Sequence, residues 1–199
     1  MEKTVVKQLD LLPTQAALPE GFVYREEFIT VEQERALIES ISRLDFVAPS
    51  MHGVAAKRRT VHFGRSYEFD TFKLGPAPPI PDFLRKLRDQ AASVTSANGD
   101  EFAEVLVSEY PPGAPIGWHR DAPQFGIIVG ISLGAACTMK FRPWPAKRDR
   151  RRGARPLLQP LAPRSIYVLA GEVRSRWQHH IPPAKELRYS VTFRTLRDA

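Results

Sequence analysis

Two segments of the sequence carry the residues best suited to chemistry. His119 and Asp121 stand two positions apart, and the adjacent pair His179 and His180 comes later in the chain. Since side chains alternate along a β-strand, His119 and Asp121 would point to the same side of one. Two imidazoles and one carboxylate on one side of a metal form the ligand set of non-haem Fe(II) sites with open positions. The sequence therefore predicts an iron site made by His119, Asp121 and a distal histidine.

This pair has an ordinary alternative, because a His and an Asp two residues apart also occur as a surface pair or beside a core histidine. The sequence around His119 and Asp121 favours a metal site over this alternative. A turn-rich segment, residues 110–115, precedes it, and an alternating strand comes before that segment. In this strand Leu106, Ser108 and Tyr110 share a face. We therefore expect these three side chains to lie beside the site that His119 and Asp121 form.

A second alternating strand is predicted near the end of the chain. One of its faces is apolar, and the other carries two arginines; the apolar face has Tyr189, Val191 and Phe193, and the polar face has Arg188, Ser190, Thr192 and Arg194. Buried arginines need anionic partners. A dicarboxylate ligand would supply them, because the planar guanidinium binds a carboxylate through two nitrogens. The alternative is an exposed face with two solvated arginines.

The rest of the sequence predicts how these segments are positioned. Thr30 and Gln33 match a capping box, which begins a helix over residues 31–44, and a second helix is expected over 83–94. Strands follow at 104–110, 117–121, 127–133, 137–142, 165–169 and 188–194, after a short one at 22–24. The fold class is thus mainly β with flanking helices (α+β), a sandwich or barrel whose mouth can unite distant positions.

Composition narrows the functional classes. The 199 residues fit a single domain, expected over residues 21–199, with residues 1–20 as an N-terminal extension anchored by Leu11, Leu12 and Leu18. The net charge of +7 favours a polyanionic partner such as nucleic acid, although a basic protein can simply be well solvated. The single cysteine, Cys137, excludes an intramolecular disulfide and a multi-cysteine zinc cluster. With neither a signal peptide nor a membrane span visible, we expect a cytoplasmic location. We also expect a monomer.

Together these motifs resemble the AlkB family of Fe(II)/2-oxoglutarate dioxygenases. The resemblance covers about residues 104–195 and consists of His119-x-Asp121, of His179-x-Ile181-Pro182, and of the strand 188–194. It implies a double-stranded β-helix (jelly-roll) core and Fe(II) held by His119, Asp121 and His179. The family pattern designates His179, rather than His180, as the distal ligand.

The same resemblance assigns the co-substrates, 2-oxoglutarate and O2. Ser108 and Tyr110 would contact 2-oxoglutarate, although the family often has Asn at the position of Ser108. Arg188 would hold its far carboxylate, Arg194 would border its metal-bound end, and Ser190 lies between them. Decarboxylation to succinate would drive hydroxylation of an N-methyl group, and the product would release formaldehyde.

Two further basic segments bear on the substrate. Residues 57–67 mix cations and aromatics and are similar in place to the lid of repair members, so Arg58, Arg59, His62 and Tyr67 are candidates for gripping a flipped base. An ordinary hairpin with Val61 and Phe63 in the core is the alternative. Arg142 and the basic run 147–155 are candidates for phosphate contacts, or else form a solvated loop.

These observations predict an oxidative demethylase of alkylated DNA or RNA bases that acts on single strands or flipped bases. Some repair members carry a second acid two residues beyond the metal carboxylate, where this chain has Pro123. The alternatives are an oxygenase acting on a protein or small molecule, and a non-catalytic nucleic-acid-binding module on the same fold.

Overall fold

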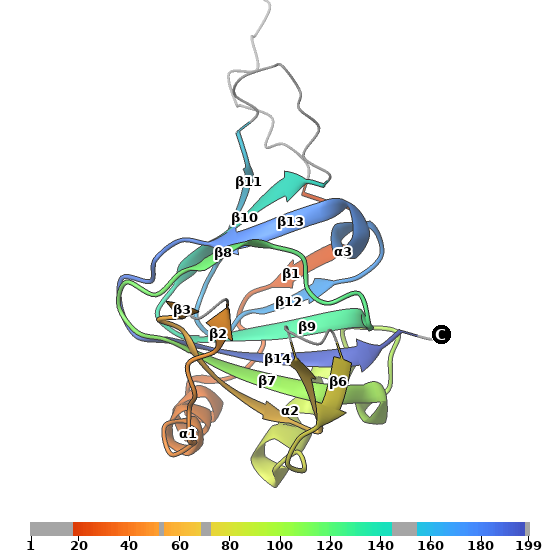
Figure 1. The fold of residues 1–199 in the computed structure, drawn as a ribbon. Coiled ribbons are helices and arrows are strands. Elements are labelled where there is room, and N and C mark those ends of the chain that lie inside the picture. Colours follow the sequence, from red (N-terminus) through yellow and green to blue (C-terminus); the bar gives the residue numbers. More distant parts are fainter. Residues whose placement is uncertain (1–17, 52–53, 69–72, 145–154, 198–199) are drawn as a thin grey trace, which may run out of the picture.

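Two antiparallel β-sheets face each other in the computed structural model, which describes residues 18–51, 54–68, 73–144 and 155–197 (Figure 1). The large sheet has the order β1 (Phe22–Arg25), β12 (Ile166–Leu169), β9 (Phe125–Gly134), β14 (Arg188–Leu196), β7 (Phe102–Tyr110) and β4 (Arg59–Phe63). The small sheet has the order β11 (Leu157–Leu161), β10 (Cys137–Pro143), β13 (Trp177–Ile181) and β8 (Ile116–His119). Two short hairpins, β2 (Ser50–Met51) with β3 (Val54–Ala55) and β5 (Arg65–Glu68) with β6 (Lys73–Pro76), complete the strands.

Helices α1 (Val31–Ile41) and α2 (Asp82–Ala92) cover the outer face of the large sheet (Figure 1). The predicted capping box is present: the Gln33 N–H donates to Thr30 Oγ1 at 3.2 Å, and the Thr30 N–H donates to Gln33 Oε1 at 2.8 Å. Helix α1 ends three residues before the predicted end, where the Ser42 hydroxyl bonds the carbonyl of Glu39 at 2.9 Å. A 3-10 turn, Gly99–Glu101, leads from α2 into β7.

Alternation along β14 divides the protein into two layers, as the sequence predicts. Tyr189, Val191 and Phe193 belong to the core between the large sheet and the helices. Ser190, Thr192 and Arg194 line a cavity between the two sheets. A second apolar cluster, which includes Phe125, Met139, Phe141, Leu161 and Ile181, packs on this inner side. The cavity is therefore embedded in the sandwich rather than placed on its surface.

The predicted fold class is confirmed, and most predicted strands are present with shifted ends. Several elements were not predicted: the short strands β2, β3, β5 and β6, the 3-10 turn, the strands β11 and β13, and the short helix α3 (Glu172–Arg176). Strand β8 was predicted to reach Asp121 but ends at His119, so Asp121 lies in the loop that follows. Proline in β11 and the lack of simple alternation in the WQHHI segment of β13 concealed these two strands.

The N-terminal segment contacts the domain through Leu18, which packs against the inner apolar cluster. The other two predicted anchors, Leu11 and Leu12, lie outside the described residues, as does most of the basic run 147–155. Across the described ranges, none of the helices has the length and apolar character needed to cross a membrane.

Candidate active site

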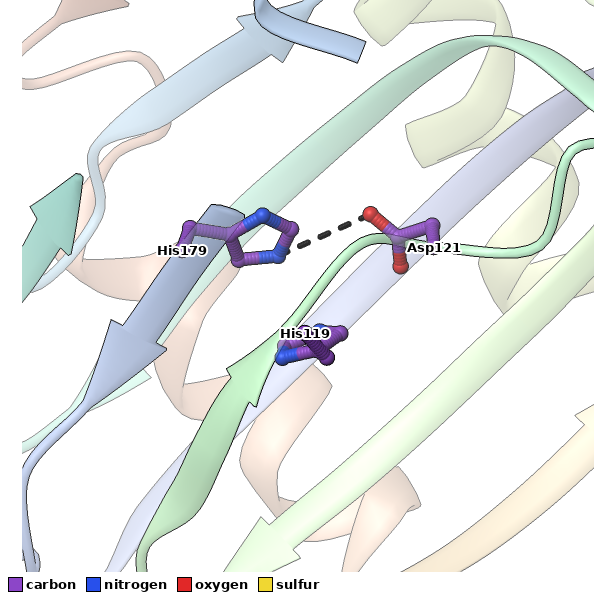
Figure 2. Close-up of side chains that lie close together, drawn as sticks. All are labelled: His119, Asp121 and His179. Carbon is purple, nitrogen blue, oxygen red and sulfur yellow. Dashed lines mark ion pairs between the residues drawn. The ribbon is translucent and has the colours of Figure 1, made fainter. Parts of the chain in front are cut away.

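His119, Asp121 and His179 line the cavity and lie close together, as Figure 2 shows. One nitrogen or oxygen atom from each of them lies within 4.8 Å of the others. The two imidazole rings are 4.2 Å apart between centroids, and His179 Nε2 lies 3.6 Å from Asp121 Oδ2. Two imidazole nitrogens and one carboxylate oxygen at this spacing fit a single iron ion held from one side.

Strand pairing explains why the distant histidine reaches the site. β13 lies antiparallel to β8 with His179 directly opposite His119. His180 faces the other side of the small sheet, where its Nδ1–H donates to the carbonyl of Ile116 at 2.7 Å and its ring lies 5.1 Å from that of Trp118. The structure therefore brings His179, not His180, to Asp121.

Hydrogen bonding and burial prepare both histidines to act as ligands. His119 Nδ1 lies 2.8 Å from the carbonyl of Gly117, which can only accept, so Nδ1 carries the proton and Nε2 is left for a metal. Burial lowers the pKa of His119, and it lowers the pKa of His179 to about 3. Both rings are therefore neutral near pH 7, which is the form that binds metals.

Asp121 is held ionised by the groups around it. Burial by itself would raise the pKa of Asp121, but His179, Arg194, His119 and Arg174 together hold it well below its usual value. Arg194 Nη2 donates to Asp121 Oδ1 at 3.2 Å, and Arg174 Nη1 donates to Oδ2 at 3.4 Å. These two bonds fix the carboxylate from both oxygens.

Arg194 also connects the carboxylate to a second, fully buried acid. Its Nη1 donates to Glu104 Oε2 at 3.1 Å, and His62 Nδ1 donates to Glu104 Oε1 at 2.8 Å. The result is a continuous network from the cavity wall at His62 to the predicted iron ligand Asp121. Glu104 was not among the predicted site residues, although it shares the strand face of Leu106, Ser108 and Tyr110, which was the available signal.

Arg174 is a second residue that sequence reasoning missed. It lies in α3, is 6% exposed, and donates to the carbonyls of Ala122, Phe125 and Gly126 at 3.0–3.1 Å. It thus holds the whole loop that carries Asp121. The sequence around it has neither helical nor strand periodicity, so no pattern indicated its burial.

The cavity between the sheets has a volume of about 320 Å³ and is lined by side chains from both of them. Tyr167 contributes its ring from β12 and is hydrogen-bonded by the side chain of Ser190. Burial raises the pKa of Tyr167 to about 12, so its phenol stays neutral. Its ring passes directly over Gly130, where a Cβ atom would lie 2.1 Å from Tyr167 Cζ. Only glycine fits at that position.

Arg188 is fully buried and incompletely paired. Its Nε donates to Ser132 Oγ at 3.1 Å, and its guanidinium carbon lies 4.9 Å from the centre of the Tyr110 ring. Neither Nη1 nor Nη2 has a hydrogen-bond partner among the described residues. A buried guanidinium without an anionic partner destabilises the protein. Its two unpaired nitrogens match the two oxygens of a carboxylate. The Arg188 side chain can therefore bind an anionic group with the geometry of a carboxylate.

The structure separates the predicted substrate residues into two groups. Arg58, His62 and Tyr67 line the cavity, and Arg58 Nη1 donates to Ser108 Oγ at 3.2 Å. Arg59 points to the other side of the large sheet, where its Nε donates to Glu109 Oε1 at 2.7 Å. Arg142 lies on the outer face of the small sheet, 4.4 Å above the ring of Trp118. The structure therefore places neither Arg59 nor Arg142 at the cavity.

The segment around β4 combines features of both alternatives drawn from the sequence. Val61 and Phe63 pack in the core on the helix side, as the hairpin alternative expects. His62 occupies the opposite face and reaches the cavity. One strand thus serves the core with one face and the site with the other.

Comparison with known proteins identifies the family. The model of the 2OG-Fe(II) oxygenase superfamily matches residues 26–194. The chain belongs to this superfamily. The solved structure of OsALKBH1 has the same fold, with a TM-score of 0.69 at 15% identity over 90% of this chain and 98% of that one. The chain is therefore a dioxygenase that uses Fe(II), 2-oxoglutarate and O2, which confirms the predicted enzyme class and cofactors, and it has the fold of the predicted AlkB-like family.

Three relatives show how the chain compares in sequence. It is 29% identical to uncharacterized protein L905 of Acanthamoeba polyphaga mimivirus, over 88% of this chain and 85% of the relative. It is also 29% identical to tRNA (carboxymethyluridine(34)-5-O)-methyltransferase alkbh8 of Xenopus tropicalis, over 93% of this chain and 28% of that protein. The Arabidopsis thaliana alkylated DNA repair protein ALKBH8 homolog is 29% identical over 89% of this chain and 55% of its own length. The chain thus spans only part of the last two.

Proposed function

We propose that this protein is an oxidative demethylase of alkylated bases in DNA or RNA. The observation that carries the proposal is a single cavity that joins the His119, Asp121 and His179 triad to a rim of cationic and aromatic side chains, Arg58, Trp118 and Arg120. A cavity of about 320 Å³ lies within the usual size range of small-molecule sites, roughly 300–1,000 Å³.

In this proposal His119, Asp121 and His179 hold Fe(II). When bound, iron and 2-oxoglutarate supply oxidative decarboxylation to succinate and hydroxylation of the substrate's N-methyl group. The protein keeps both imidazoles neutral by burial and keeps Asp121 ionised through Arg194 and Arg174. The ligands are thus ready for the metal before it arrives, which limits reorganisation on binding.

Arg188 would bind the far carboxylate of 2-oxoglutarate, with Tyr110 covering the guanidinium. Ser108 and Ser190 lie on the cavity wall between this arginine and the metal end. Arg194, already paired with two carboxylates, would border the metal-bound end without carrying the charge of the co-substrate alone. These assignments agree with what the family resemblance implies.

Nucleic acid as the substrate is supported by charge and by the relatives. The chain has a net charge of +7, and Arg58, His62 and Tyr67 line the cavity together with Trp118 and Arg120. The names of two relatives refer to tRNA and to alkylated DNA repair. We propose a single-stranded or base-flipped substrate, a monomeric enzyme, a cytoplasmic location, and a role in the repair of alkylation damage.

The test is turnover of short oligonucleotides that carry 1-methyladenine or 3-methylcytosine, in DNA and in RNA, with Fe(II), 2-oxoglutarate and O2. The expected result is formaldehyde and succinate in equal amounts, together with the unmethylated base. The His179→Ala variant is the matched control and should give neither product.

The result that contradicts the proposal is equally specific. An enzyme that binds metal and converts 2-oxoglutarate to succinate, yet releases formaldehyde from none of the methylated oligonucleotides, would act on another class of substrate. Turnover of a methylated peptide or a free small molecule under the same conditions would identify that class.

A further inference from the structure

The outer face of the small sheet carries a row of cations and aromatic rings behind the iron site. Met139 and Phe141 of β10 point inward, so Lys140 and Arg142 point outward. On β13 the inward position is that of His179, and its neighbour His180 points outward. Arg120 joins them, because its guanidinium lies over the ring of Trp144. We name this row the cation–aromatic face; it consists of Trp118, Arg120, Lys140, Arg142, Trp144 and His180.

These side chains are stacked in an ordered way. The Arg142 guanidinium lies 4.4 Å above the Trp118 ring and donates from Nε to Gln178 Oε1 at 2.7 Å. The Trp118 and His180 rings are 5.1 Å apart with planes inclined by 30°. Lys140 lies directly opposite His180 in the strand register. Arg120 covers Trp144 at 5.1 Å, and Trp144 is 40% exposed.

The cations on this face lack acidic partners among the described residues, unlike several arginines on the helix side. Lys140, Arg142 and Arg120 form no salt bridge with any carboxylate that the structure describes. Arg43, just after α1, pairs with Glu39 at 2.6 Å, and Arg88 on α2 pairs with Asp100 at 2.8 Å. Charges left without acidic partners and set among aromatic rings are the features of a surface that receives a phosphate backbone and stacks bases.

The face is also continuous with the cavity. Trp118 and Arg120 line the cavity at its rim, and both also take part in the stacking on the outer side. A strand with one base in the cavity would therefore pass over Trp118 toward Arg142 and Trp144.

We infer that the cation–aromatic face is a second contact surface for single-stranded nucleic acid, which holds nucleotides flanking the one in the cavity. This inference rests on the proposed function in taking nucleic acid as the substrate class. It assigns Arg142 a role that its position outside the cavity would otherwise leave without explanation. Affinity for a strand would then depend on residues that never touch the reacting base.

The probe is a fluorescein-labelled oligothymidylate of about twelve nucleotides, a length within the usual range of single-strand sites. It carries no methylated base, so its binding, followed by fluorescence anisotropy over a series of salt concentrations, does not depend on turnover. For the double variant Lys140→Gln/Arg142→Gln we expect roughly tenfold weaker binding and a salt slope lower by about 1.4, because two phosphate contacts are lost.

A second variant tests stacking without changing charge. Trp144→Ala should weaken binding at least about fivefold, and it should reduce the quenching of tryptophan fluorescence when the oligonucleotide is added. Arg85→Gln on α2 is the matched control, since Arg85 is an exposed arginine paired with Asp82 on the opposite side of the protein. It should bind the probe as the wild type does, and thermal unfolding verifies that each variant is folded.

Wild-type affinity and salt slope in both variants would overturn the inference, as would an equal loss in Arg85→Gln. Failure of the proposed function would give a different experimental result. Binding that depends on the cation–aromatic face, without formaldehyde release from methylated oligonucleotides, would refute the demethylase proposal alone. Demethylation that proceeds while both variants bind like the wild type would refute this inference alone.

Discussion

The two ends of the inner face of β14 each carry an arginine, and the two arginines are in opposite states. Arg194, at the metal end, donates to Glu104 at 3.1 Å and to Asp121 at 3.2 Å. Arg188, at the far end, donates only from Nε to the Ser132 hydroxyl, while both of its Nη atoms are buried without partners in the described part of the chain. One strand therefore presents a cation neutralised by the protein and a cation left for an anion.

This difference shows which charges serve the fold and which serve a ligand. A buried guanidinium between two carboxylates stabilises their position and loses its use for binding new anions. A buried guanidinium without an anion destabilises the empty protein and gains most when a carboxylate binds. The same residue type in the same strand thus has two roles, decided by whether the neighbouring strand supplies an acid: Glu104 of β7 lies opposite Arg194, and Tyr110 of β7 lies opposite Arg188.

Replacement of the paired arginine should have the largest effect. Arg194→Met leaves the carboxylate of Glu104 buried with His62 as its one remaining side-chain hydrogen-bond partner among the described residues, so we expect a loss of about 3–5 kcal/mol in the free energy of unfolding. Metal affinity should also fall, because Asp121 loses the donor to Oδ1. Urea denaturation and metal titration measure the two effects. Stability equal to that of the wild type would contradict the role of Arg194 in the fold.

Replacement of the unpaired arginine should separate binding from stability. Arg188→Met is expected to raise KM for 2-oxoglutarate by about 100-fold, because a charge-assisted bond to a carboxylate contributes roughly 1.5–3 kcal/mol. Its stability without ligand should equal or exceed that of the wild type, since a buried unpaired charge is removed. Succinate formation at varied 2-oxoglutarate gives KM. An unchanged KM, or a marked loss of stability, would contradict the proposed difference between Arg188 and Arg194.

A substitution at Gly130 tests the part of the cavity wall that lies between Arg188 and Arg194. A methyl group there meets Tyr167, so Gly130→Ala should push the ring into the cavity and destabilise the protein by about 1–3 kcal/mol. KM for 2-oxoglutarate should rise less than in Arg188→Met. The double variant Gly130→Ala/Tyr167→Phe is not a rescue, because Cζ and Cε1 still collide, whereas Gly130→Ala/Tyr167→Ala should recover part of the lost stability. Full stability in Gly130→Ala would show that the ring moves freely.

Acidification should affect the metal end and leave the Arg188 end unchanged. The pKa of His179 is about 3 in the folded protein, below the value of about 6.5 for an unfolded histidine. Between these values the unfolded chain binds more protons, so the stability of the metal-free protein should fall as the pH falls from about 6.5 toward 4. His179→Gln should show a weaker dependence in urea denaturation across this range. An identical pH dependence in that variant would exclude His179 as its source.

The sequence predicts those parts of the site that depend on alternation within one strand. The inward positions of Ser190 and Arg194 follow from the pattern of β14, and those of Ser108 and Tyr110 follow from β7. Their burial does not follow from alternation, because an apolar opposite face is equally compatible with a solvated polar face; it comes from the small sheet that covers them. The fold class follows from the same strand pattern, whereas 2-oxoglutarate and O2 were predicted from the resemblance of the motifs to the AlkB family.

Contacts between elements were beyond what the pattern could predict. Arg174 reaches Asp121 and its loop from a five-residue helix with no apolar stripe. Arg59 turned away from the cavity because β4 pairs with β7 in a register that sets it opposite Glu109. Arg142 turned outward because Phe141, its neighbour, fills the inner core. Strand register and helix packing determine where these three side chains point, and neither can be predicted from a single segment of the sequence.

The central claim is that His119, Asp121 and His179 bind the iron while Arg188 binds the far carboxylate of 2-oxoglutarate. The most direct test is a crystal structure of the protein crystallised in the absence of oxygen. The crystals would contain Mn(II) in place of iron, together with 2-oxoglutarate. We expect the metal on His119 Nε2, His179 Nε2 and an oxygen of Asp121, and the distal carboxylate on both Nη atoms of Arg188. A metal bound by His180, or a co-substrate whose far carboxylate leaves Arg188 unpaired, would contradict the account.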